Sequence, residues 1–197
     1  MYRLDLKEMH QYYSDNISGG NYPISLELSR YLYNLCWKVK PNTILDRGSG
    51  FSSFLFRKYA FLANTTTAFL TIDKHRALDI YTVDNKKAWL DTTKIFLEYC
   101  GLPSTNMYTW SEFLEEGLDK KKYDLILEDY SFPYRPKSLP LVLEMLAPEG
   151  YLILDDANLE RYDVAIKKAA HKYKLDLIPI TKETKDKKGR FAALIRK

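Results

Sequence analysis

The stretch NTILDRGSGFSSFLF, residues 42–56, decides the fold. The apolar run that ends at Asp46 predicts a buried strand, Gly48 and Gly50 predict a sharp turn, and the segment after them predicts a helix that begins at a serine. A strand, a glycine turn and a helix in this order form the usual ligand-binding unit of an open parallel sheet. Arg47 departs from the pattern, because it places a charge where the end of the strand should be apolar.

Length and composition are those of one globular domain. The chain has 197 residues, of which 46% are hydrophobic and 28% are charged, and a chain of this size can bury a sizeable core. We expect one domain over residues 1–197, with residues 1–23 as an N-terminal arm or lid and residues 24–197 as the core. Cys36 and Cys100 are too few and too far apart for a disulfide frame or a zinc site.

Hydropathy and charge bear on compartment and partners. No run reaches the roughly 20 apolar residues that span a bilayer, and the N-terminus lacks the apolar core of a signal peptide. We therefore expect a cytoplasmic protein without a membrane partner. The net charge of +4 is mild and lies largely in TKETKDKKGR, residues 181–190, which predicts a solvated loop and disfavours a nucleic-acid partner. These features do not predict the oligomeric state.

Short apolar runs alternate with longer segments of helical period, which predicts a parallel sheet with crossover helices. The segment 64–79 is open to three interpretations: a loop, an excursion over the site, or a short extra strand. Strands are expected at 43–46, 80–84, 106–110, 123–129, 151–156, 175–180 and 191–196, and helices at about 24–38, 52–63, 85–102, 111–118, 137–150 and 160–173.

Acidic residues stand at the ends of several expected strands. Asp46, Asp84 and Asp129 end the first, second and fourth strands, and the fifth ends in the pair Asp155 and Asp156. Ligands of open parallel sheets bind beyond the carboxyl ends of the strands. The acids therefore indicate a site at that edge.

The glycine turn matches neither of two common phosphate-binding loops. A dinucleotide fingerprint needs a third glycine where this sequence has Ser53, and an acid about 20 residues further on, whereas Asp84 comes considerably later. A P-loop needs the sequence G-K-[ST], which is absent. The acid two residues before Gly48 would repel a pyrophosphate but suits the ammonium group of an amino acid.

At this acid the sequence resembles the class I S-adenosylmethionine-dependent methyltransferases, whose first motif is acid-x-Gly-x-Gly. TVDNKKAWLDTTKIFLEYCGL is similar to the family's second-strand motif, and YDLILEDYSFPYRPKSLPLVLEMLAPEGYLILDDAN is similar to its fourth strand, helix and fifth strand. The resemblance covers residues 24–196. It implies a Rossmann-like α/β fold with a seven-stranded, mostly parallel sheet, an antiparallel last strand and helices on both faces.

The resemblance is greatest to small single-domain members of O-methyltransferase type. It implies transfer of a methyl group from S-adenosylmethionine to oxygen on a small-molecule acceptor. Asp84 would bind the cofactor's ribose, unless it caps the next helix, and Trp110 would flank the adenine, unless it is a core aromatic. The implied cofactor-binding residues are Asp46, Gly48, Ser49, Gly50, Ser52, Asp84, Asn85, Trp110 and Ser111.

Two carboxylates are the candidate catalytic residues. Asp129 and Asp156 match metal-ligand positions in the catechol-type branch of the family, but Ala157 stands where that branch has an asparagine, which disfavours magnesium. Because methyl transfer mainly requires a positioned acceptor and a group that takes its proton, Asp129 is the first candidate for that role and Asp156 the second. His10 and His75 are weaker candidates, and His171 is weaker still.

Two other functions remain open. An NAD(P)-dependent oxidoreductase could use a similar sheet, although the missing third glycine opposes it. A non-catalytic cofactor-binding module could keep the same fold. The sequence SFPY, residues 131–134, lacks the Asn-Pro-Pro-Tyr pattern of base-methylating enzymes and so argues against them.

The odd arginine has a candidate partner. Side chains alternate along a strand, so Arg47 should point away from the face to which Asp46 points. Glu128 precedes Asp129 as Arg47 follows Asp46, and the two strands are neighbours in the resembling fold. We therefore predict a partly buried Arg47–Glu128 ion pair, with an anionic substrate as the rival partner of Arg47. Acceptor specificity is expected from the N-terminal arm and from residues 64–79 and 130–137.

Overall fold

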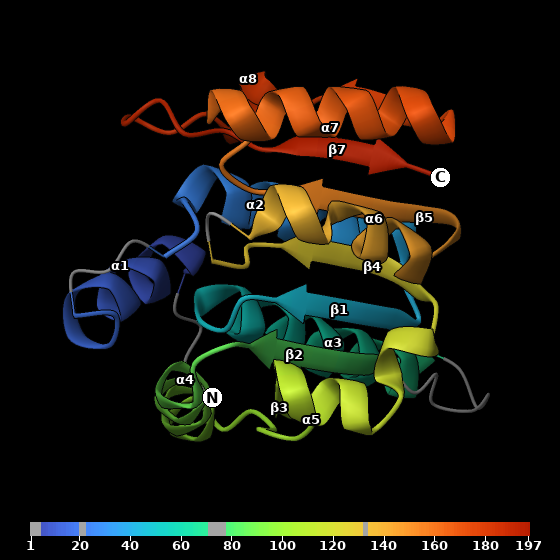
Figure 1. Cartoon of the computed structure of the whole chain (residues 1–197). Coiled ribbons are helices and arrows are strands. Elements are labelled where there is room, and N and C mark those ends of the chain that lie inside the picture. Colours follow the sequence, from blue (N-terminus) through green and yellow to red (C-terminus); the bar gives the residue numbers. More distant parts are fainter. Residues whose placement is uncertain (1–4, 20–22, 71–77, 132–133) are drawn as a thin grey trace.

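A seven-stranded sheet in the order β3-β2-β1-β4-β5-β7-β6 organises the computed structural model, which describes residues 5–19, 23–70, 78–131 and 134–197 (Figure 1). Strands β1 to β5 pair in parallel, and β7 pairs antiparallel with both β5 and β6. The predicted mostly parallel sheet with an antiparallel last strand is therefore confirmed. The strands are β1 Thr43–Arg47, β2 Asp79–Asp84, β3 Met107–Thr109, β4 Tyr123–Glu128, β5 Leu146–Leu154, β6 Asp176–Pro179 and β7 Ala193–Arg196.

Helices cover both faces of the sheet, as predicted. In Figure 1, α5, α6 and α7 lie in front of the sheet and α2 and α3 lie behind it. No helix of the described residues is long and apolar enough to cross a membrane. The helices are α1 Leu6–Asn16, α2 Leu26–Val39, α3 Phe51–Leu70, α4 Lys87–Tyr99, α5 Trp110–Glu115, α6 Arg135–Met145, α7 Glu160–Tyr173 and α8 Thr181–Thr184, with a 3-10 turn at Leu118–Lys120.

Each face of the sheet has its own hydrophobic cluster, and β1 contributes to both. Ile44 packs into the cluster under α2 and α3, whereas Leu45 packs into the cluster under α5, α6 and α7. The alternation of a strand then places Asp46 on the first of these faces and Arg47 on the second. Both charged side chains are almost fully buried.

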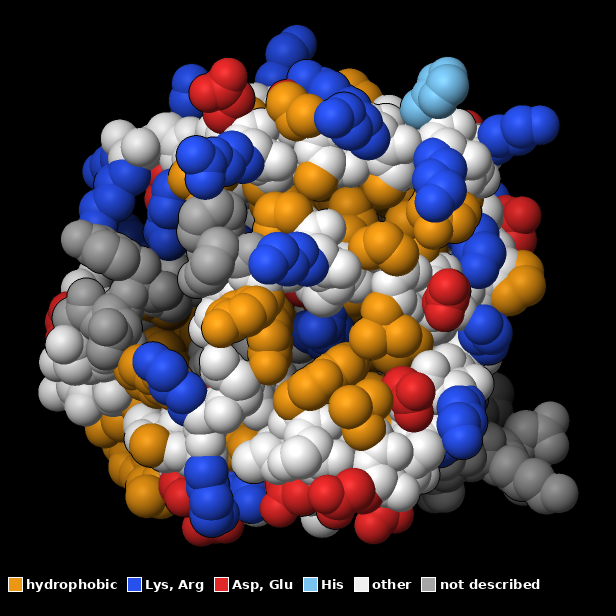
Figure 2. Space-filling model, in the orientation of Figure 1, with side chains coloured by type: hydrophobic (Ala, Val, Ile, Leu, Met, Phe, Trp, Pro, Cys, Tyr) orange, Lys and Arg blue, Asp and Glu red, His pale blue; other side chains and the backbone are white. Residues whose placement is uncertain are grey.

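The face that carries α5, α6 and α7 divides by charge. In Figure 2, Lys and Arg side chains are spread over the upper part of this face, around α7, and acidic side chains line its lower edge.

The lysine-rich segment predicted to be a loop begins with the short helix α8 and continues as a turn held by hydrogen bonds of Asp186 with Arg190.

Two predicted boundaries are wrong. The helix after the glycine turn does not end near Ala63 but continues to Leu70, so residues 64–70 are neither a loop nor a strand. They also lie far from the glycine turn, because α3 begins there and runs back along the sheet, and β2 starts at Asp79 beside Thr43. An excursion over the site is thus wrong for residues 64–70; residues 71–77, with His75, lie outside the described residues.

The second wrong boundary separates α6 from β5. Residues 147–150, predicted to close the helix, belong to β5, which begins at Leu146. The pairing of β4 with β5 shifts between Tyr123 and Leu125, and this irregularity accommodates Pro148 and the tight approach at Gly150, where an added Cβ would lie 2.8 Å from the carbonyl oxygen of Ala147. Proline and glycine here mark a bulge in a strand and not the end of a helix.

The described part of the N-terminal arm is an ordered helix at the carboxyl ends of the parallel strands (Figure 1). Helix α1 has a capping box formed by Asp5 and Glu8. Its buried Tyr13 packs against Phe51 and Phe96, with ring centroids 5.7 and 4.9 Å apart. Helix α1 is therefore packed against α3 and α4.

Candidate functional site

The turn between β1 and α3 requires glycine at two positions. Gly48 and Gly50 have φ angles of 130° and 146°, which L side chains rarely adopt. A Cβ on Gly48 would lie 2.8 Å from the backbone oxygen of Asp129, and one on Gly50 would lie 3.0 Å from the hydroxyl of Tyr13. The turn is therefore packed between the end of β4 and helix α1.

The backbone donors of this turn are already used within the chain. The amide of Gly48 donates to the carbonyl of Val83 (2.9 Å), that of Ser49 to Oδ2 of Asp84 (2.9 Å), and that of Gly50 to Oγ of Ser53 (3.3 Å). A loop that binds pyrophosphate needs such amides free to point at the ligand. The hydrogen bonds thus agree with the sequence in opposing a dinucleotide loop.

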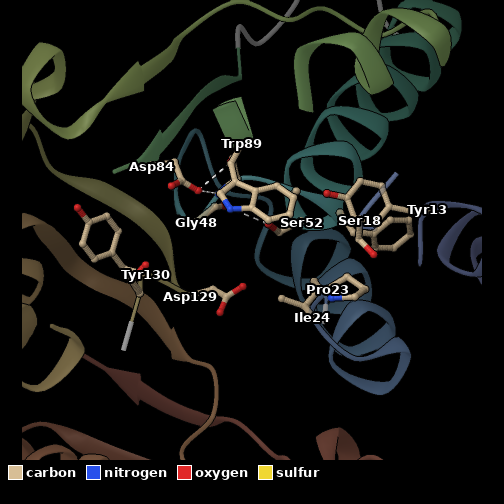
Figure 3. Close-up of a pocket in the computed structure, with 14 residues that line it drawn as sticks. Tyr13, Ser18, Pro23, Ile24, Gly48, Ser52, Asp84, Trp89, Asp129 and Tyr130 are labelled. Carbon is tan, nitrogen blue, oxygen red and sulfur yellow. Dashed lines mark hydrogen bonds between the residues drawn. The ribbon is translucent and has the colours of Figure 1, made fainter. Parts of the chain in front are cut away.

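A cavity of about 210 Å³ opens beside the turn at the carboxyl edge of the sheet. In Figure 3, Trp89 extends from the side of Asp84 towards Tyr13, and the carboxylate of Asp129 faces the space in front of Ile24. The lining includes six of the predicted site residues, namely Gly48, Ser49, Gly50, Ser52, Asp84 and Asp129. It also includes Tyr13, Ser18, Pro23, Ile24, Phe51, Trp89, Tyr130 and Ser131.

Asp84 fastens the glycine turn to the start of α4. Its carboxylate accepts from the amide and the hydroxyl of Ser49, at 2.9 and 2.8 Å, and from the amide of Lys86 at 2.9 Å. The N-cap of α4 is Lys86, so the alternative that Asp84 is that N-cap is wrong. A carboxylate has about four acceptor sites, so Asp84 keeps capacity for a ligand donor. Asn85, beside it, is exposed and lies outside the cavity lining.

Asp46 lies beneath the turn and does not line the cavity. It is fully buried, and its Oδ2 accepts from the hydroxyl of Ser53 at 2.6 Å and more weakly from that of Thr82 at 3.4 Å. Its Oδ1 has no hydrogen-bond partner among the described residues. Burial raises the pKa of Asp46 to about 7, although its hydrogen bonds and the nearby Arg57 act in the other direction. Asp46 is thus a buried acid with one acceptor atom that no described residue uses.

Trp110 and Ser111 lie outside the cavity. The indole of Trp110 stacks on Phe113 with centroids 5.5 Å apart, and its ring lies 4.8 Å from the guanidinium carbon of Arg47. Ser111 is exposed, with its hydroxyl 3.2 Å from that of Thr109. Thr109 is the register partner of Asp84, so the two residues follow β3 beside the end of β2 but do not line the cavity.

The second catalytic candidate lies beside the first in a cluster of carboxylates. Oxygen atoms of Asp129, Asp155 and Asp156 all lie within 4.8 Å of one another. Arg135, at the start of α6, donates to Oδ1 of Asp129 at 2.5 Å and to Oδ2 of Asp156 at 2.9 Å. Sequence reasoning missed Arg135, since one arginine in an irregular loop gives no sign of the direction in which it points.

Burial and mutual repulsion raise the pKa values of Asp129 and Asp155 in this cluster. Burial raises the pKa of Asp129 well above its usual value, Arg135 opposes the shift, and Asp155 and Asp156 add to it. The pKa of Asp155 rises to about 6, through burial first and the neighbouring Asp156 second. Burial disfavours the charge on Arg135, but the three aspartates outweigh it and raise the pKa of the guanidinium. Arg135 therefore stays protonated and favours ionised partners.

The histidines in the described residues do not line the cavity. His10 has its Nε2 2.7 Å from the carbonyl oxygen of Ile24, and its ring meets Phe51 edge-on. It therefore joins α1 to the segment before α2. His171 is exposed on α7.

Comparisons with known proteins rest on structure alone, since no protein-family model and no curated protein matches the sequence. One similar structure is the O-methyltransferase TomG from Streptomyces achromogenes, involved in tomaymycin synthesis and solved in complex with SAM. Its TM-score is 0.68 at 12% identity, over 99% of this chain and 90% of that chain. Another is an O-methyltransferase from Bacillus cereus in complex with SAH, with a TM-score of 0.66 at 16% identity, over 95% and 96% of the two chains. This chain has the class I methyltransferase fold.

The class I methyltransferase fold does not by itself determine a reaction. A precorrin 8W decarboxylase from Methanobacterium thermoautotrophicum is also similar, with a TM-score of 0.56 at 17% identity, over 89% of this chain and 91% of that chain. The function of this chain must therefore be argued from its own site.

Magnesium, which the catechol-type branch of the fold family implies, does not fit this site. The oxygens of Asp129 and Asp156 that would ligate it already accept hydrogen bonds from Arg135. A hard divalent cation needs several oxygen ligands in fixed geometry, and a guanidinium between those ligands repels it. We therefore assign no step to a metal ion.

Proposed function

We propose that this protein is an S-adenosylmethionine-dependent methyltransferase that acts on oxygen of a small-molecule acceptor. The observation that carries the proposal is the cavity itself, which lies at the carboxyl edge of the sheet between Asp84 on β2 and Asp129 after β4. This is the edge at which open α/β sheets bind ligands.

The residues present suit an adenosyl amino acid. Asp84 has acceptor capacity for a ribose hydroxyl. Asp46 does not line the cavity, but its carboxylate beneath the turn, when ionised, favours an ammonium group over a phosphate there. Gly48, Ser49, Gly50 and Ser52 would surround the methionine part of the cofactor. S-adenosylmethionine, when bound, supplies an electrophilic methyl group. Asn85, Trp110 and Ser111 remain predicted cofactor residues. None of them lines the cavity, so they would contact the ligand only after a change in conformation.

The acceptor would lie on the side of the cavity where Asp129 faces Ile24 (Figure 3). Asp129 is the group that would take the proton of an acceptor hydroxyl, because it is the one carboxylate of the described acidic cluster that lines the cavity. Its raised pKa makes it a better base than an exposed aspartate. Ile24 and Tyr13 lie on this side of the cavity and Tyr130 lies on the other side of Asp129 (Figure 3), so the lining has apolar and aromatic parts that suit a small organic acceptor.

The test is turnover on a panel of phenols, catechols and aliphatic alcohols, with formation of S-adenosylhomocysteine as the readout. We expect turnover on at least one acceptor class, and a loss of about 10²–10⁴-fold in Asp129→Asn if Asp129 takes the proton. Cofactor binding without turnover on any acceptor would favour the non-catalytic module. Binding of NADH in place of S-adenosylmethionine would favour the oxidoreductase.

A further inference from the structure

Arg135 joins the ends of two strands through four hydrogen bonds. Its Nε donates to the carbonyl oxygen of Tyr130, and its Nη1 donates to the carbonyl oxygen of Asp155 at 3.0 Å. Its Nη1 and Nη2 also donate to carboxylates, to Asp156 at 2.9 Å and to Asp129 at 2.5 Å. Every nitrogen of the guanidinium is thus used at the carboxyl ends of β4 and β5.

The position of Arg135 in its helix indicates that the acids hold it there. It is the first residue of α6, where the helix dipole disfavours a positive charge. The side chain is nevertheless 6% exposed, against 25% for each of its two carboxylate partners. A buried guanidinium at this end of a helix requires compensation, and the carboxylates of Asp129 and Asp156 supply it.

A guanidinium and a divalent ion cannot share these ligands. Arginine does not deprotonate in proteins, so the charge between Asp129 and Asp156 is permanent. Its planar fork also sets the direction of the carboxylates that it binds, which a monovalent ion in solution would not do.

We infer that Arg135 takes the place of a metal ion in this protein, neutralising Asp129 and Asp156 and positioning Asp129 towards the cavity. The inference deepens the proposed function, since it names the residue that positions the proposed base. The test of this inference uses no cofactor and no acceptor. The inference about Arg135 can therefore fail while the proposed function stands, and the proposed function can fail while the inference stands.

The test is binding of Mn²⁺, followed by electron paramagnetic resonance, to five forms of the full chain: wild type, Asp129→Asn, Arg135→Ala, Arg135→Lys and the double variant Arg135→Ala/Asp156→Asn. Mn²⁺ suits carboxylate oxygens as ligands, and its paramagnetic resonance signal distinguishes the bound ion from the free ion. We expect no specific binding to wild type or to Arg135→Lys, which keeps the charge. Arg135→Ala should bind Mn²⁺ and gain thermal stability from it, and the double variant should lose most of that binding.

Two outcomes would overturn the inference. One is Mn²⁺ binding to wild type that Asp129→Asn removes, because Arg135 would then not exclude the ion. The other is a folded Arg135→Ala protein that binds no Mn²⁺. If Arg135→Ala does not fold alone, refolding is compared with Mn²⁺ and with K⁺: recovery with Mn²⁺ only supports the inference, and failure with both contradicts it.

Discussion

Arg47 on β1 and Glu128 on β4 form a fully buried ion pair, with Nη1 and Oε2 2.5 Å apart and the side chains 1% and 0% exposed. The two residues are register partners in adjacent parallel strands. The guanidinium carbon of Arg47 also lies 4.8 Å from the ring of Trp110 and 4.9 Å from the ring of Tyr130. The predicted pair is confirmed, although it is more buried than the sequence indicated, and Arg47 does not line the cavity.

Breaking this pair should be costly, whereas replacing both partners should not be. Arg47→Met leaves Glu128 buried without its cation, so we expect a loss of about 3–5 kcal/mol in the free energy of unfolding. Arg47→Met/Glu128→Leu should recover most of that loss, because no charge then remains buried. Urea unfolding of both variants measures the difference.

The exposed pair Lys87–Asp91 on α4 provides the control. Lys87→Ala should change the free energy of unfolding by no more than about 0.5 kcal/mol. A loss below about 1 kcal/mol in the free energy of unfolding of Arg47→Met would contradict the prediction that an unpaired Glu128 is costly to bury.

Asp46 predicts a specific dependence of stability on pH. Its pKa rises from 3.8 to about 7 on folding because of burial. The folded state therefore binds the proton more tightly, and the associated stability is present below about pH 4 and is lost as pH rises to about 7. Asp46→Asn cannot ionise, so above about pH 7 it should exceed wild type by up to about 4 kcal/mol.

The difference in stability between Asp46→Asn and wild type should be constant above about pH 7 and shrink steadily from about pH 7 to about pH 4 in thermal unfolding. The same variant should bind the cofactor more weakly, because an amide lacks the charge that suits an ammonium. A constant stability difference at all pH values would contradict the buried, raised-pKa aspartate.

Comparison of alanine variants at Gly48 and Gly101 distinguishes the cost of backbone strain from the cost of a steric clash. Both have positive φ, of 130° and 68°, but an added Cβ at Gly101 meets no heavy atom within 4 Å. Gly48→Ala forces a Cβ against the backbone of Asp129, so we expect a loss of roughly 3 kcal/mol or more and weaker cofactor binding. Gly101→Ala should cost about 1 kcal/mol and leave binding unchanged. Equal effects of the two variants in urea unfolding would contradict the close packing at Gly48.

Trp89 should report ligand binding by its fluorescence. It lines the cavity, whereas Trp37 packs against Tyr59 behind the sheet and Trp110 packs against Arg47. Addition of S-adenosylhomocysteine should therefore change the emission of wild type and leave that of Trp89→Phe nearly unchanged. Persistence of the full change in Trp89→Phe would place the ligand elsewhere.

The order of elements followed from the sequence because it depends on local signals. Apolar runs, the glycine turn and acids at strand ends predicted the sheet, and the alternation of β1 predicted the partner of Arg47. The boundary at residues 147–150 was wrong because proline and glycine occur both at helix ends and at bulges in strands. The boundary at residues 64–70 was wrong because a run of polar threonines continued a helix.

The site was predicted only along the turn and the strand ends. Trp89 and Arg135 were missed because each belongs to a helix start, where the direction of a side chain depends on how the helix packs. Trp110 was predicted from its place after β3, but its contact with Arg47 is a long-range packing effect. Residues 130–137 stay predicted determinants of specificity, and Arg135 within them also holds the acidic cluster.

The most direct test of the account is calorimetric titration of the folded protein with S-adenosylhomocysteine, beside NADH and beside the Asp84→Asn variant. We expect binding in the micromolar range, no binding of NADH, and a loss of about tenfold or more in Asp84→Asn, since its amide replaces a carboxylate acceptor. No heat and no thermal shift with either S-adenosylmethionine or S-adenosylhomocysteine would contradict the central claim.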